Sequence, residues 1–230
     1  MANKTAAGLV SYAKAQLGKP YWYGTFGNKA TQSLLTSKTK QYPSHYTSDR
    51  IAKYKSQIGQ RVHDCVGLIK GYLWSEDATA TPKYNASQDV SANGMLSKCK
   101  EKGDISTIPE IPGVLVFMPG HVGVYIGNGK VIEARGFAYG VVETRLSARA
   151  WKNWGKCPWL EYTTSSATYF KKYTGSSKSI VDSLKAVGAS STFAYRKKIA
   201  AVNNISDYIG LSTQNIKMLN LLKQGKLIKP

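Results

Sequence analysis

The stretch HDCVGLIKGYLW, residues 63–74, decides how the rest of the chain is interpreted. The letters after Cys65 are mostly apolar and numerous enough for a buried helix, which places the cysteine on its first turn. Backbone N–H groups at a helix start are unpaired and favour an anion, so they lower the pKa of a thiol there. Cys65 is therefore a candidate nucleophile, and a small core residue is the alternative interpretation for a free cysteine.

A cysteine nucleophile needs a general base, and the chain has three histidines, His45, His63 and His121. His45 lies in an irregular polar stretch. His63 is so close to Cys65 along the chain that we expect its ring to be directed elsewhere. His121 opens a strand and alternates with a glycine and a tyrosine, while the apolar residues take the core face, so His121 is the candidate base.

The next strand, entered through a Gly-Asn-Gly turn, carries Glu133. In a tight hairpin its carboxylate can lie near His121 and orient the imidazole. The alternative is an ordinary exposed carboxylate on a strand.

The remaining pattern predicts helices over 6–17 and 87–102, and mostly a long loop, with one short helix at most, over 28–54. Short apolar runs divided by glycine turns predict hairpins of an antiparallel sheet at 114–118, 121–126, 130–134 and 141–146, with 159–162 as one further candidate strand. Helices first and a meander later indicate an α+β fold.

The end of the chain has a different character. The polar letters TTSSAT open a predicted linker, 163–172, between a domain at 1–162 and a small module at 173–230. Helical periods recur in that module at 179–187, 193–202 and 213–222. Residues 164–230 hold 11 Lys+Arg and 2 Asp+Glu, so they carry +9 of the net +19 and form a basic, mainly helical domain.

A net charge of +19 on 230 residues favours polyanionic partners: nucleic acid, anionic membranes or teichoic-acid-bearing cell walls. No nucleic-acid-binding motif is recognisable, so we expect no nucleic-acid partner. No run approaches the roughly 20 apolar residues of a membrane span, and the first residues lack the apolar core of a signal peptide. Cys99 and Cys157 have no zinc-ligand spacing, so we expect core thiols, no metal and no cofactor.

Three motifs in order carry a resemblance: GKPYWYG at 18–24, HDCVGLIK at 63–70 and PGHVGVYIGNGKVIEA at 119–134. Together they resemble the NlpC-type family of papain-like bacterial cell-wall peptidases, over residues 7–162. The resemblance implies a cysteine-bearing helix packed on a five- or six-stranded antiparallel sheet. It also implies that Cys65 is the nucleophile, His121 the general base and Glu133 the third, orienting residue, where many relatives have another histidine.

The same resemblance assigns two substrate-binding residues. Tyr21 would line the site near the thiolate, and Asp64 would contact the amino group of the substrate. Val66 stands where relatives often have a serine, so a contact made by that hydroxyl would be absent.

The resemblance implies hydrolysis of the peptide stem of peptidoglycan, between D-glutamate and the diamino acid that follows it. An N-acetylmuramoyl-L-alanine amidase of the same fold is the alternative, as are a non-catalytic wall-binding protein and a lipid-directed acyltransferase of the same thiol superfamily. A catalytic domain followed by a small basic module is the layout of many phage endolysins. We therefore expect a monomer made in the host cytoplasm that reaches the cell wall through a holin-type pore or acts outside the cell, with the C-terminal module binding the wall.

Overall fold

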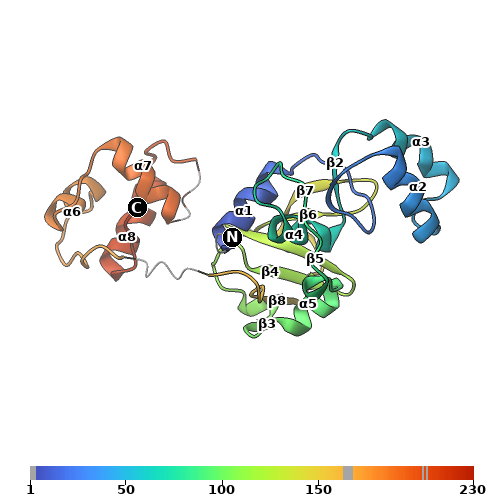
Figure 1. The fold of residues 1–230 in the computed structure, drawn as a ribbon. Helices are drawn as coiled ribbons and strands as arrows, with labels where there is room; N and C mark the ends of the chain where they lie inside the picture. The colour runs from blue at the N-terminus through green and yellow to red at the C-terminus, as the bar shows by residue number, and fades with distance from the viewer. Residues whose placement is uncertain (1–3, 163–167, 204, 206) are drawn as a thin grey trace. The chain divides into compact units, whose positions relative to one another are not determined.

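The computed structural model describes residues 4–162, 168–203, 205 and 207–230. The chain forms two compact units, Met1–Thr163 and Thr164–Pro230, each with its own hydrophobic core (Figure 1). Most of the predicted TTSSAT linker, residues 163–167, lies outside the described residues.

A six-stranded antiparallel sheet forms the centre of the first unit, in the order β3-β8-β4-β5-β6-β7. Its strands are β3 Lys102–Asp104, β4 Leu115–Met118, β5 His121–Gly127, β6 Lys130–Ala134, β7 Val141–Arg145 and β8 Asn153–Gly155. The β5–β6 register pairs Val124 with Ile132, which puts His121 and Glu133 on the same face because side chains alternate along a strand. The four hairpin strands β4 to β7 confirm the prediction.

Three helices cover the other face of this sheet: α1 Ala6–Ala15, α4 Cys65–Trp74 and α5 Ala92–Lys98 (Figure 1). Leu9 and Leu68 from the helices pack with Val122 and Val124 from β5, and all four side chains are fully buried. A helix that starts at the cysteine and lies on an antiparallel sheet, followed by a small helical unit, confirms the predicted α+β, papain-like fold.

The sheet face that carries His121 is partly covered. The strand pattern predicted a core on the opposite face of β5 alone. A second cluster covers the His121 face, formed by Val116, Tyr125, Val131 and Trp151. Trp151 follows β7 in the chain and folds back over these strands. The strand pattern missed this cluster because Trp151 stands in an irregular segment with no period of its own.

The predicted loop at 28–54 is wrong: this region is helical. It contains α2 Gln32–Gln41 and α3 Ser48–Ser56, beside a two-stranded sheet of β1 Phe26–Lys29 and β2 Arg61–His63 (Figure 1). Trp22, Leu35, Tyr46 and Tyr54 form their own core there. Large aromatic side chains from irregular positions replace the apolar period that sequence reasoning looks for.

Two further element boundaries differ from prediction. The helix expected over 87–102 is shortened to α5, because Ser91 caps its N-terminus by accepting a hydrogen bond from Gly94 N–H. Its last predicted residue, Lys102, opens β3 instead. The strand expected at 159–162 is reduced to a single bridge between Thr5 and Glu161, and β8 joins the sheet in its place.

The second unit contains α6 Ile180–Ala186, α7 Phe193–Val202 and α8 Ser212–Gln224, close to the three predicted helices. Leu184, Ile199, Met218 and Leu222 are fully buried in its core. Phe170 joins them, and its N–H donates to Leu227 O at 2.9 Å. Residues 168–172, predicted as linker, therefore belong to this unit. Across the described parts of both units, no helix combines the length and apolar character of a membrane span.

Candidate active site

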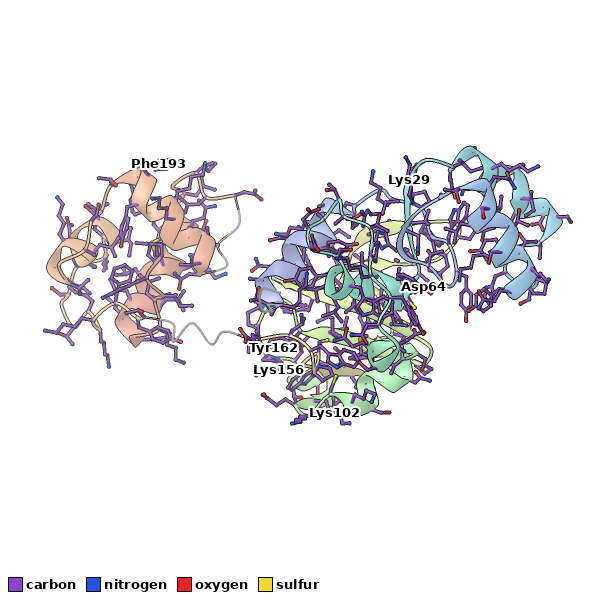
Figure 2. The ribbon with its side chains drawn as sticks, viewed as in Figure 1. Lys29, Asp64, Lys102, Lys156, Tyr162 and Phe193 are labelled. Atoms are coloured by element: carbon purple, nitrogen blue, oxygen red, sulfur yellow. The ribbon has the colours of Figure 1, made fainter. Side chains whose placement is uncertain are left out.

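Cys65 is the first residue of α4, and the residue before it holds the start of the helix in place. Asp64 is the N-cap: its Oδ1 accepts from Gly67 N–H at 2.5 Å, and its Oδ2 accepts from Gly24 N–H at 2.8 Å. One carboxylate thus joins α4 to the loop before β1. Figure 2 labels Asp64 where α4 meets the part of the unit that carries α2 and α3.

The electrostatics of the thiol differ from the prediction of a lowered pKa. Burial raises the pKa of Cys65 to about 12, and the negative charge of Asp64 adds to the rise. The backbone N–H groups of Cys65, Val66 and Val122 act in the opposite direction but do not outweigh it. The resting thiol is therefore neutral, and a base must take its proton before it can attack.

His121 stands at the start of β5, next to the segment that contacts this thiol. Cys65 Sγ lies 3.9 Å from Gly120 O. The imidazole Nε2 of His121 is 2.6 Å from Glu133 Oε2. The carboxylate therefore fixes the Nε2 side of the ring, and Nδ1 is the ring nitrogen that Glu133 leaves for proton transfer.

Glu133 is fully buried, which rules out the alternative of an exposed strand carboxylate. Besides His121, Thr144 Oγ1 donates to its Oε1 at 2.8 Å and Arg149 Nε lies 3.1 Å from the same oxygen. Burial by itself raises the pKa of Glu133, but the hydrogen bonds from His121 and Thr144 and the charge of Arg149 outweigh it and hold that pKa below its ordinary value. Glu133 is thus an anion that neutral-pH conditions do not protonate.

Sequence reasoning missed the residues that support this pair. The ring of Trp151 stacks on His121 with the centroids 5.6 Å apart and the planes 15° from parallel. Gly123 makes room for it, since a Cβ there would lie 3.0 Å from the Trp151 ring and 2.6 Å from Val131. Trp151, like Thr144 and Arg149, lies outside the hairpin that carries His121 and Glu133, so no local spacing indicated it.

The other candidate residues have separate places. Tyr21 packs against the main core, and its backbone forms an isolated parallel β-bridge with His63. Burial is the main cause that raises the pKa of its hydroxyl, and the nearby Cys65 is the next largest. His63 is fully buried and bonds Gln16 through Nε2 at 3.2 Å, so its ring is directed away from the thiol as predicted. His45 stacks on Tyr23 with the ring centroids 3.6 Å apart.

A cleft of about 540 Å³ opens at the thiol. Its lining includes Tyr23, Lys38, Tyr42, Asp64, Cys65, Lys70, Tyr84, Asp89, Asn93 and Gly120. Asn93 holds the wall near His121, because its Oδ1 accepts from Gly120 N–H at 3.0 Å. The volume falls within the roughly 300–1,000 Å³ of small-ligand sites, which suits a short peptide.

The other two cysteines take no part in this site. Cys99 and Cys157 are buried in the main core, and burial raises their pKa to about 11 and about 12. Within the described ranges, no group of three or more His, Cys, Asp or Glu side chains could hold a metal ion.

A helix-borne cysteine, a strand histidine and a carboxylate that orients it, on a helix-covered antiparallel sheet, define a papain-like cysteine hydrolase. Residues 18–159, more than half of the chain, match the model of the NlpC/P60 family. The chain belongs to the NlpC/P60 family, and the predicted cysteine peptidase is confirmed at the level of the family.

Solved structures with a similar fold include proteins from Trichomonas vaginalis and from mycobacteria. NlpC2 from Trichomonas vaginalis aligns at 17% identity and a TM-score of 0.42, covering 70% of this chain and 48% of that one. The peptidoglycan hydrolase RipB from Mycobacterium tuberculosis aligns at 17% identity and a TM-score of 0.40, covering 68% of this chain and 65% of that one. The P60 domain of antigen MAP1204 from M. avium subspecies paratuberculosis aligns at 17% identity and a TM-score of 0.41, covering 68% of this chain and 96% of that one. This chain thus spans less than two thirds of the first two. Among curated protein sequences, none matches it.

Proposed function

We propose that this protein hydrolyses an amide bond in the peptide stem of peptidoglycan, between D-glutamate and the following diamino acid. The observation that carries the proposal is the thiol of Cys65, which lies at the start of α4 in an open cleft and contacts Gly120. The next residue is a histidine that a buried glutamate holds at 2.6 Å. Family membership supports the substrate class. RipB, one of the similar structures, is itself named a peptidoglycan hydrolase.

The first half of the reaction forms an acyl-enzyme. His121 takes the proton of the Cys65 thiol, and the sulfur attacks the scissile carbonyl carbon. The Gly67 N–H is occupied by Asp64, so the N–H groups of Cys65 and Val66 are the first-turn donors that remain for the oxyanion. His121 then gives its proton to the departing amine as the C–N bond breaks.

The second half releases the acyl group. His121 takes a proton from water, the resulting hydroxide attacks the thioester carbonyl, and the C–S bond breaks. The sulfur leaves as a thiolate and recovers the proton from His121, which restores the resting site. Glu133 stabilises the imidazolium during both halves because its carboxylate stays ionised.

The basic second unit supports a role in wall binding. Its +9, from 11 Lys+Arg and 2 Asp+Glu at 164–230, is suited to the anionic polymers of a bacterial cell wall. A tethered second module raises the local concentration of the enzyme at its substrate. We therefore propose a monomeric, endolysin-type enzyme that acts on the wall from the phage-infected cell or from outside.

The test is digestion of diaminopimelate-type peptidoglycan by the intact protein and by Cys65→Ala, with mass spectrometry of the soluble products. Fragments with an N-terminal diaminopimelate, absent with Cys65→Ala, support the endopeptidase. Free stems that begin with L-alanine replace it with the amidase. Sedimentation with walls but no released product from either protein replaces it with a binding protein.

A further inference from the structure

The cleft beside Cys65 contains a lysine that makes no direct ion pair among the described residues, although Asp64 and Asp89 act on its charge from a distance. Lys38, on α2, lines the cleft with Gln41 and Tyr42. Its ammonium donates to Gln41 Oε1 at 2.9 Å and lies 5.3 Å from the centroid of the Tyr42 ring. Both partners are neutral, and within the described part of the chain Lys38 forms no ion pair.

The other charged groups of the cleft already have partners. Lys70 is paired with Asp89 at 2.5 Å, and the hydroxyl of Tyr84 donates to the second oxygen of Asp89 at 2.9 Å. The carboxylate of Asp64 accepts two backbone N–H groups, at its two oxygens. Among the charged side chains that line the cleft, Lys38 is thus the one whose direct partners are all neutral, and its ammonium can still pair with a carboxylate of a ligand.

Packing fixes the helix that carries Lys38. Leu35, one turn before it, is fully buried, and Thr31 caps the start of α2 by accepting from Leu34 N–H. The end of the helix is pressed against the loop that Asp64 holds. Gly24 has a positive φ of 75°, and a Cβ there would lie 2.5 Å from the Tyr42 ring. The two walls of the cleft, one with Lys38 and the other with Cys65, are therefore in contact through Gly24.

We propose that Lys38 forms a carboxylate subsite, which binds a free carboxylate of the stem peptide next to the scissile bond. This inference rests on the proposed function and names what the cleft selects. Partial burial weakens the hydration of the ammonium, so an arriving carboxylate gains more from it than it would from a fully solvated lysine. Two carboxylates of the stem have this chemistry: the α-carboxylate of D-glutamate and the free carboxylate of diaminopimelate.

The experiment compares kcat/KM for matched tripeptides of L-alanine, γ-linked D-glutamate and diaminopimelate. In one peptide the α-carboxylate of D-glutamate is amidated, and in another the diaminopimelate carboxylate is amidated. We expect one of the two amidations to lower kcat/KM of the wild-type protein by roughly ten- to a hundredfold, the ratio for losing one charge-assisted hydrogen bond. The sensitive peptide identifies which carboxylate binds.

The variants separate recognition from folding. Lys38→Met should lower kcat/KM for the unmodified peptide by the same factor and leave kcat/KM for the sensitive amide unchanged. Lys38→Arg keeps the positive charge and should restore part of the preference for the acid peptide over its amide. Lys40→Met, on the exposed side of the same helix, is the matched control and should retain the wild-type preference. Equal losses on acid and amide peptides in Lys38→Met, or a wild-type protein indifferent to both amidations, overturn the proposal.

A binding measurement keeps this test distinct from that of the proposed function. Calorimetric titration of Cys65→Ala with the same peptides measures the preference without cleavage. If the wild-type protein cleaves nothing but Cys65→Ala binds the acid peptide more tightly than its amide, the proposed function fails and the subsite stands. If the acid and amide bind equally, the subsite fails whatever the activity.

Discussion

Glu133→Gln isolates the charge of the residue that orients His121. Glutamine keeps the size and one oxygen acceptor, so the Nε2 contact at 2.6 Å can still form, but as a neutral hydrogen bond. A bond to a charged group contributes about 1.5–3 kcal/mol and a neutral one about 0.5–1.5 kcal/mol. The difference of about 1–2 kcal/mol acts on the imidazolium that forms during the reaction. We expect kcat/KM to fall about five- to thirtyfold.

The assay is chromatography of the products of a purified stem peptide, with urea unfolding of each variant as a check on folding. Glu143→Gln, on β7, is the matched control, since that glutamate pairs with Lys130 and is partly exposed. We expect it to leave kcat/KM unchanged. Glu133→Ala should lose more than Glu133→Gln, because it also leaves Arg149 without its carboxylate. Wild-type kcat/KM in a well-folded Glu133→Gln would refute the role of the charge.

Three further predictions concern stability and the second unit. Burial lowers the pKa of His63 to about 3, so on acidification the unfolded state binds a proton before the folded state does. Through this residue alone the free energy of unfolding should fall by about 2 kcal/mol from pH 8 to pH 5, with the loss starting below the ordinary histidine pKa of about 6.5. Urea unfolding of His63→Gln should show a flatter pH dependence. Gly123→Ala should cost about 1–3 kcal/mol and lower kcat, because its Cβ meets Val131 and the Trp151 ring that stacks on His121; unchanged unfolding and kcat would contradict this. Removing residues 164–230 should reduce co-sedimentation with cell walls, most clearly at low salt, while the soluble peptide is still cleaved; equal sedimentation of both proteins would exclude a wall-binding role for this unit.

The sequence predicted the parts of the site that lie in local motifs. The helix start at Cys65 and the hairpin from His121 to Glu133 each fall within a short segment, where period and turn chemistry determine geometry. The supports of Glu133 come from elsewhere. Thr144 is brought in by the pairing of β7 with β6, and Arg149 lies in the segment that follows β7. No spacing in one chain predicts which later arginine a buried carboxylate will meet.

The two larger errors have physical causes. The region of α2 and α3 has no apolar period because its core consists of scattered aromatic residues such as Trp22 and Tyr54. The predicted direction of the pKa shift at Cys65 was wrong, because the prediction considered the helix N-terminus without the burial of the sulfur and the adjacent Asp64. A helix-terminus effect of under about 1 kcal/mol is smaller than a desolvation penalty.

The neutral thiol has a consequence for how long the enzyme survives. Peroxides oxidise thiolates, and thiols react far more slowly, so the rate of inactivation follows the ionised fraction. With burial raising the pKa of Cys65 to about 12, little of it is ionised at neutral pH. The neutral thiol is therefore protected against peroxides, and under the proposed mechanism it becomes reactive only when His121 removes its proton.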